Sequence, residues 1–330
     1  MTTLHNRVGL GTFPLANVFS EITSRGAEKI VKTFIDNGGY YIHTAPMYGF
    51  GEVEKLLGKA LKGYSREKFY LITMCGYKDV EGKTFKTIPR GATYEEVIRE
   101  CDISLARLKQ DFIDLYFIHS PDPSTPFEET MKALNKLKKI GKIKSIGVSN
   151  VNLSELKEYR RYGKVDFIQN RFSLINRSID GEFANYLLEN KILLIPYQVI
   201  DRGQLTGKAL EGFPMRSEDL RIGRSDWLPE KKDLVAKWVK DRLAPIAKHL
   251  GITIGQLSIA WALHQKYIGF VLVGTTNVDY LLINLKADNV KLTSTTLKNI
   301  ESAYKSLELD IQRKYGQPIR EVRGLNEKYY

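Results

Sequence analysis

The chain has 330 residues, 43% of them hydrophobic and 27% charged, which suits a globular protein and falls within the length range of one α/β barrel. No stretch approaches the roughly 20 apolar residues that a bilayer-spanning helix needs, and the two cysteines, Cys75 and Cys101, are too few for a disulfide framework or a thiolate metal site. The net charge of +12 is spread over amphipathic patterns without interleaved aromatics, which argues against nucleic-acid or membrane partners and favours an anionic small molecule.

Short β-branched or aromatic runs alternate with amphipathic helical patterns along the chain. Thr93 and Glu96 have the spacing of a capping box, which predicts a helix start there. Strands are predicted at residues 8–13, 40–44, 69–73, 113–118, 145–148, 167–170, 192–196 and 270–273. Helices are predicted at residues 24–37, 52–61, 94–108, 126–140, 153–162 and 181–189.

These strands are apolar on both faces and are separated by helices, which is typical of a parallel sheet. Eight such units in one chain predict a closed (β/α)₈ TIM barrel. An open, doubly wound sheet would need a G-x-G-x-x-G turn after an early strand, and the sequence has none.

Three segments interrupt the repeat: residues 75–92, 201–231 and a tail that begins at about residue 307. The first two follow the third and seventh predicted strands, so we expect them on the barrel face where active sites form. We expect a single domain over residues 1–330. Residues 1–7 are polar and lack an apolar signal core, so a cytoplasmic location is predicted. The oligomeric state is not indicated.

Polar and aromatic side chains cluster where four predicted strands end. The second strand leads into His43-Thr44-Ala45-Pro46-Met47-Tyr48-Gly49, and the third into Met74-Cys75-Gly76. The fourth and fifth strands end in Asp114-Leu115-Tyr116-Phe117-Ile118-His119 and Gly147-Val148-Ser149-Asn150.

This ordered series resembles the aldo-keto reductases, which carry D-T-A-x-x-Y-G, a strand ending in Lys, D-L-Y-x-x-H, G-[IV]-S-N and a later Gln. The match covers most of the chain, from about Gly9 to Asn284. The resemblance implies a TIM barrel that transfers a hydride from a nicotinamide cofactor to a carbonyl. It implies that Tyr48 protonates the forming alkoxide and that His119 orients the carbonyl.

Two further positions depart from the family pattern. The family's catalytic Asp is His43 here, and its Lys is Met74. Loss of the Lys alone would leave a buried, unpaired carboxylate at a cost of roughly 3–5 kcal/mol, so the two changes form one adjustment. Tyr48 is then expected to stay protonated, which favours reduction over alcohol oxidation. His43 compensates as an imidazolium or a general base, or it is a neutral, locally hydrogen-bonded side chain. For Met74 we expect a packing role.

The same resemblance implies that the nicotinamide is contacted by Ser149, Asn150, Gln169 and Tyr197. Arg202 lies in the loop that holds the pyrophosphate in relatives, where Asp201 is an unexpected neighbour for phosphates. The remaining cofactor positions, which fit an anion pocket at a helix N-terminus, are Gly274, Thr276 and Asn284. The choice between NADP(H) and NAD(H) stays open. Candidate walls of the substrate pocket are Phe13, Phe50, Tyr77 and Trp227.

Three functions stay open at this stage. The first is a reductase of an aldehyde, ketone or sugar substrate. The second is a non-redox lyase or epimerase of a carbonyl sugar, with His43, Tyr48 and His119 moving protons. The third is a binding or regulatory barrel with impaired catalysis. No metal site is predicted.

Overall fold

Eight parallel strands form one sheet in the order β7-β6-β5-β4-β3-β2-β1-β8. The computed structural model describes residues 5–78, 89–179, 181–212, 215–222, 224 and 227–316. The order of these parallel strands confirms the predicted (β/α)₈ barrel. The strands are β1 (Val8–Gly11), β2 (Tyr41–His43), β3 (Tyr70–Cys75), β4 (Ile113–Ile118), β5 (Ile143–Ser149), β6 (Phe167–Gln169), β7 (Leu193–Leu194) and β8 (Val271–Val273).

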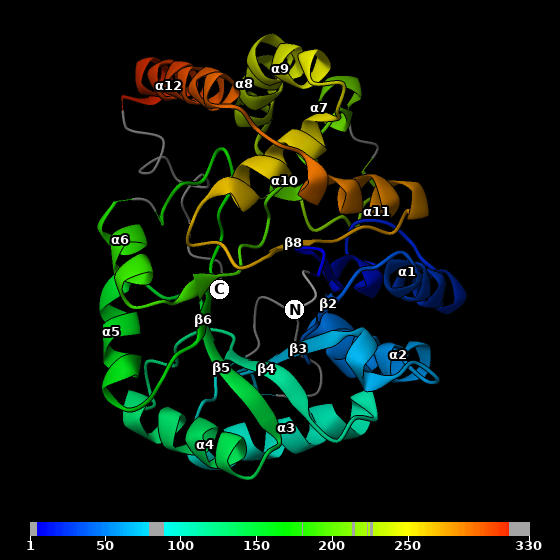
Figure 1. The fold of residues 1–330 in the computed structure, drawn as a ribbon, viewed down its shortest axis with the longest axis vertical. Coiled ribbons are helices and arrows are strands. Elements are labelled where there is room, and N and C mark those ends of the chain that lie inside the picture. Colours follow the sequence, from blue (N-terminus) through cyan, green and yellow to red (C-terminus); the bar gives the residue numbers. More distant parts are fainter. Residues whose placement is uncertain are drawn as a thin grey trace.

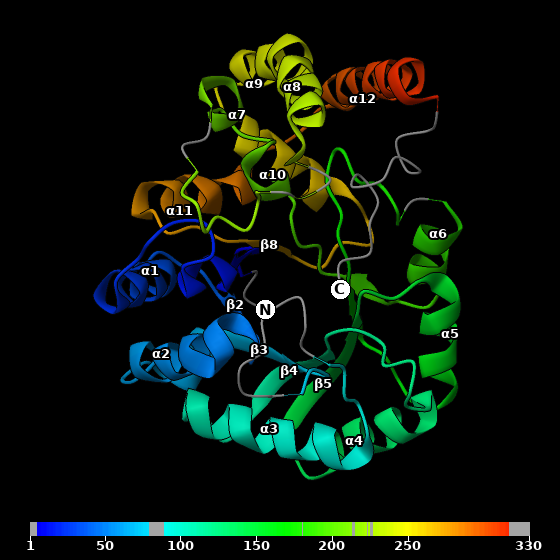
Figure 2. The same cartoon turned by 180° about the vertical axis from the view of Figure 1, so that it is seen from behind.

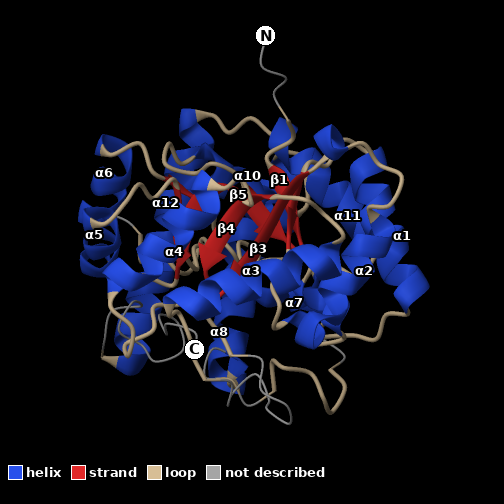
Figure 3. Cartoon of the chain, turned by 90° about the horizontal axis from the view of Figure 1, so that it is seen from below, coloured by secondary structure: helices blue, strands red, loops and turns tan. Residues whose placement is uncertain are grey.

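The helices surround the strands (Figures 1 and 3). They are α1 (Ser24–Asp36), α2 (Glu52–Ala60), α3 (Tyr94–Leu108), α4 (Phe127–Lys139), α5 (Leu153–Arg161), α6 (Glu182–Glu189), α7 (Lys208–Glu211), α8 (Pro229–Trp238), α9 (Ala244–His249), α10 (Ile254–His264), α11 (Val278–Leu285) and α12 (Ser294–Tyr315). Short 3₁₀ segments are η1 (Phe13–Ala16), η2 (Tyr48–Gly51), η3 (Arg66–Lys68), η4 (Asp201–Gly203) and η7 (Lys286–Asn289), and η6 (Val239–Leu243) is a π-helical turn. None of these described helices is long and apolar enough to cross a membrane.

The seam between β7 and β8 is the least regular part of the barrel. It consists of a single bridge between Leu194 and Ile268 and flanking backbone bonds, such as Leu272 N to the carbonyl oxygen of Pro196 at 3.0 Å. The predicted strand at 192–196 is shortened to two residues. Pro196 has no N–H to donate, so it cannot continue a regular ladder.

The C-terminal helix differs from the prediction. α12 continues to Tyr315, past residue 307, where the tail is expected to begin. Leu307 and Ile311 are both fully buried, and α12 lies beside α8 and α9 outside the ring of barrel helices (Figures 1 and 2). Apolar residues at one helical face therefore extend the helix. Residues 317–330 lie outside the described part, as do parts of the two long loops.

Side chains alternate between two cores along the strands. In β3, Ile72 and Met74 point into the barrel, where they pack with residues such as Phe117 and Ile195. Leu71 and Cys75 instead belong to the core between the barrel and its helices. This alternation, which follows from the two-residue period of a strand, decides which residues can reach the barrel mouth.

Candidate active site at the carboxyl ends of the strands

Tyr48 lies in a tight turn directly after β2. The turn is the 3₁₀ segment η2, and it contains left-handed backbone at Gly49 (φ 59°), Phe50 (φ 53°) and Gly51 (φ 89°). A Cβ atom at Gly51 would lie 2.4 Å from Cζ of Arg107. Glycine is therefore required there both by the backbone angle and by the close approach of the guanidinium.

The same guanidinium ties the turn to the barrel wall. Nη1 of Arg107 lies 3.4 Å from Oε2 of Glu54, and the other Glu54 oxygen accepts a hydrogen bond of 2.8 Å from Oγ1 of Thr73. Burial raises the pKa of Glu54, an effect that these hydrogen bonds and Arg107 oppose. The Tyr48 turn is thus anchored to β3 through a buried polar network.

His43, Tyr48 and His119 come together at the barrel mouth. The ring centroids of Tyr48 and His119 are 6.5 Å apart with an interplanar angle of 85°. The ring of His43, at the end of β2, is 6.1 Å from that of Tyr48. Two strands separated along the chain, β2 and β4, thus deliver a phenol and two imidazoles to one place.

Both imidazoles are neutral at neutral pH. Burial lowers the pKa of His119 to about 3. Burial, together with the nearby His119, lowers the pKa of His43 to about 3, against a weaker opposing contribution from the Gln169 side chain. Desolvation disfavours the charged form of a histidine. Of the alternatives for His43, the imidazolium is therefore the one that this environment disfavours.

Met74 and Cys75 take opposite sides of the barrel wall. Met74 is fully buried in the interior core, which agrees with the expected packing role. Cys75 lies in the outer core, and burial raises the pKa of its thiol. A protonated, buried thiol is not a nucleophile.

Four predicted cofactor residues form a connected cradle across the ends of β5, β6 and β7. Oγ of Ser149 donates to the carbonyl oxygen of Gln169 at 2.7 Å. Nδ2 of Asn150 donates to the carbonyl oxygen of His119 at 2.8 Å, and the Tyr197 hydroxyl donates to Oδ1 of Asn150 at 2.6 Å. Oε1 of Gln169 is buried and makes no hydrogen bond to a described residue. That acceptor suits the amide N–H of a ligand.

The other predicted cofactor positions surround the ends of β1, β7 and β8. Thr276 shares a hydrogen bond of 2.9 Å with Ser20 of the β1 loop. A Cβ at Gly274 would lie 2.6 Å from the carbonyl oxygen of Gly11, so these two loops approach closely. Arg202 lies in η4 with φ 53°, and Asn284 is part of α11. In the described part of the chain, no cluster of His, Cys, Asp and Glu side chains could hold a metal ion.

Asp201 lies in the same loop as Arg202, but its charge is not exposed to solvent. It is almost fully buried, and its Oδ1 lies 2.6 Å from Nη2 of the equally buried Arg171. The expectation that its charge conflicts with phosphates is therefore corrected, because the guanidinium neutralises the carboxylate locally.

A model of the aldo/keto reductase family matches residues 7–305. The chain belongs to the aldo/keto reductase family. It is 32% identical over 273 residues to aldo-keto reductase YhdN of Bacillus subtilis, covering 82% of this chain and 81% of the relative. It is 29% identical to the NADH-specific methylglyoxal reductase of Escherichia coli, covering 92% and 96%. The structure of glycerol dehydrogenase AKR11B4 from Gluconobacter oxydans superposes with a TM-score of 0.82 at 25% identity, covering 96% and 95%.

The predicted substrate-pocket residues of this aldo/keto reductase fall into two groups. The Phe13 ring lies 5.0 Å from Tyr48, and the Tyr77 ring lies 5.0 Å from His119. Phe50 is 44% exposed, whereas Trp227 is buried and lies 4.9 Å from the Arg221 guanidinium. Only Phe13 and Tyr77 have described ring contacts with Tyr48 or His119.

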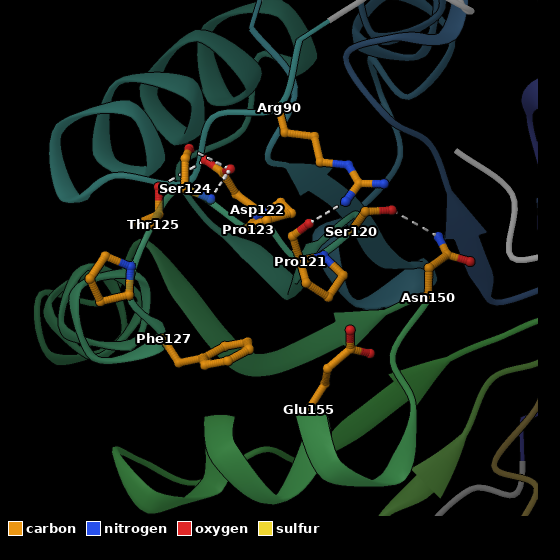
Figure 4. Close-up of a pocket in the computed structure, with 11 residues that line it drawn as sticks. Arg90, Ser120, Pro121, Asp122, Pro123, Ser124, Thr125, Phe127, Asn150 and Glu155 are labelled. Atoms are coloured by element: carbon orange, nitrogen blue, oxygen red, sulfur yellow. Dashed lines mark hydrogen bonds between the residues drawn. The ribbon is translucent and has the colours of Figure 1, made fainter.

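A pocket of about 410 Å³ opens beside the cradle, between the ends of β4 and β5. Figure 4 shows Arg90 reaching to the carbonyl of Pro121, and Ser120 lying between that loop and Asn150. Neither Tyr48 nor His119 lines this pocket. Sequence analysis missed Ser120, Arg90 and Arg171, although Ser120 directly follows His119 and Arg171 lies two residues after Gln169.

Proposed function

We propose that this aldo/keto reductase reduces an aldehyde or ketone with a nicotinamide cofactor, that Tyr48 donates the proton and that His119 orients the carbonyl. The observation that carries this proposal is the convergence of Tyr48 and His119, with ring centroids 6.5 Å apart, beside the Ser149–Asn150–Gln169–Tyr197 cradle. A phenol and a neutral imidazole on a common centre can both donate hydrogen bonds to one developing oxyanion.

The residues present fit a nicotinamide group. Oε1 of Gln169 is a buried acceptor that faces His43 but makes no geometric hydrogen bond to a described residue, and Asn150 is held by the Tyr197 hydroxyl. We assign the carboxamide of the cofactor to Ser149, Asn150 and Gln169. When bound, the reduced cofactor supplies the hydride. Either NADH or NADPH is compatible with this cradle.

Tyr48 is the proton donor of this proposal. The family's Lys position is taken by Met74, which is buried among apolar residues, and the family's Asp position is taken by the neutral His43. Because no ammonium accompanies Tyr48 from these two positions, the phenol keeps its proton and acts as an acid. We therefore expect reduction to be faster than alcohol oxidation.

The lyase or epimerase alternative is less well supported. It needs His43 or His119 to take up a proton, and burial lowers the pKa of each imidazole to about 3. Such a group is a weak base at neutral pH, where catalytic bases work best with a pKa near the operating pH.

The proposal predicts the behaviour of Tyr48→Phe. Wild-type protein is expected to quench its tryptophan fluorescence on titration with NADH or NADPH, and to consume one of them with methylglyoxal or glyceraldehyde as the carbonyl probe. Removing the hydroxyl is expected to lower kcat by roughly 10²–10⁴-fold with little change in cofactor affinity.

Tyr70→Phe is the matched control, because Tyr70 packs against the same interior core at the opposite end of the barrel. Its kcat is expected to stay near that of the wild type. Absence of cofactor binding at millimolar concentration, or full turnover by Tyr48→Phe, would overturn the proposal.

A further inference from the structure

The loop after β7 contains strained backbone at residues other than glycine. Gln198, Asp201 and Arg202 have φ values of 57°, 46° and 53°. Left-handed backbone at such residues is costly and persists only when surrounding contacts impose it. The loop therefore needs an anchor.

A buried ion pair is the anchor. Nη2 of Arg171 lies 2.6 Å from Oδ1 of Asp201, and the two side chains are 4% and 1% exposed. Oδ2 of Asp201 is also buried and meets no hydrogen-bond donor among the described residues. Among the described residues, one guanidinium compensates this carboxylate, so loss of Arg171 leaves the buried Asp201 charge without that partner.

The ion pair connects the segment after β6 to the loop after β7, next to the irregular seam between β7 and β8. β7 has only two residues, and beyond it β6 and β7 are joined by a bridge between Arg171 and Tyr197. The Tyr197 hydroxyl donates to Asn150, and Asn150 in turn donates to the carbonyl oxygen of His119. A continuous path therefore leads from Asp201 through Arg171 and Tyr197 to the reaction centre.

We propose that Arg171 and Asp201 are a positioning pair: their ion pair holds the β7 loop and Tyr197 in the shape that seats the cofactor. This inference rests on the proposed function. Neither residue is a catalytic residue, because both side chains are buried and act through Tyr197. The ion pair explains why an acidic residue, Asp201, stands in a loop that resembles the pyrophosphate-holding loop of relatives.

Asp201→Asn tests the pair with the least change of shape, because asparagine tolerates left-handed backbone. The dissociation constants of NADH and NADPH are measured by fluorescence, along with kcat at saturating cofactor and the melting temperature. The dissociation constant is expected to rise at least tenfold, while kcat changes less than threefold. A role in stability alone would lower the melting temperature without this change in affinity.

Asp114→Asn is the control, because Asp114 pairs with Arg66 at the amino-terminal end of β4, far from the strand ends that carry the cradle. It is expected to lower the melting temperature and to leave the dissociation constant within twofold of the wild type.

The double variant Arg171→Met/Asp201→Asn keeps the test decisive if the single variant does not fold, since it removes both charges of this ion pair. Its melting temperature is expected to recover, with a dissociation constant still raised at least fivefold. Wild-type affinity in either variant would overturn the positioning role. If the wild-type protein itself binds neither cofactor, the proposed function fails instead.

Discussion

His43 and His119 show how burial alone sets the chemistry of a side chain. Both imidazoles lie in the barrel mouth with almost no exposure, and each has a pKa lowered to about 3. The sequence left an imidazolium at position 43 open, because residue type does not reveal desolvation. The neutral form follows from the tertiary environment, where an unpaired buried cation is costly.

These two histidines predict a pH-dependent stability. Their pKa is near 6.5 in the unfolded chain and about 3 in the folded one, so between these values the unfolded state binds more protons. The contribution of the two histidines to the free energy of unfolding is therefore complete above pH 6.5. On acidification the free energy of unfolding is expected to fall, by up to about 1.4 kcal/mol per pH unit for each histidine.

Urea unfolding between pH 7.5 and pH 5 checks this expectation. His43→Gln should flatten the dependence, whereas His264→Gln, at an exposed position, should not. Equal slopes in the wild type and in His43→Gln would contradict the assignment.

At the scale of elements, the predicted helices α1 to α6 begin and end within one residue of their observed bounds. The capping box of Thr93 and Glu96 is confirmed, with both reciprocal hydrogen bonds present. No helix was predicted over α12, and a tail was expected from about residue 307, where the last turns of this helix are mostly polar. Burial of Leu307 and Ile311 against neighbouring elements keeps the helix intact.

α12 offers a matched pair of substitutions. Ile311→Ala is expected to lower the free energy of unfolding by roughly 2–5 kcal/mol, because Ile311 is fully buried. Leu309→Ala, at a position that is 56% exposed on the same helix, should change it by less than about 0.5 kcal/mol. Chemical denaturation measures both. Similar effects at the two positions would show that the helix does not pack as described beyond residue 306.

At the scale of the whole molecule, the charge balance bears on cofactor capture. The chain carries a net charge of +12, and its site is proposed to bind an anionic dinucleotide. A positive protein attracts an anion from a distance and raises its rate of association. This attraction weakens with ionic strength, because salt screens exposed charges beyond a Debye length of about 8–10 Å.

The whole-molecule charge therefore predicts a salt effect on cofactor use. Between about 50 and 500 mM NaCl, kcat/KM for the cofactor is expected to fall by up to roughly tenfold, while kcat at saturating cofactor stays nearly constant. Stopped-flow fluorescence should assign the loss to the association rate. An association rate that is independent of salt would rule out steering by the net charge.

The site was partly readable from the sequence for a specific reason. Parallel strands in a barrel end on the same face, so residues such as Tyr48 and His119, each just after a strand, could be placed together without coordinates. Phe50 was named as a wall of the substrate pocket and is 44% exposed, at a left-handed position of the turn after Tyr48. Loop geometry of this kind depends on contacts from elsewhere in the chain.

The sequence by itself determined the barrel and the order of its strands, because hydrophobic periodicity and local capping act over a few residues. It also determined which chemical groups stand at the strand ends. Only the tertiary structure decided that His43 is neutral, that Met74 faces inward while Cys75 faces outward, and that Asp201 is paired with Arg171. These three outcomes depend on partners 30 or more residues away or on the exclusion of water. The local sequence pattern encodes neither of these two causes.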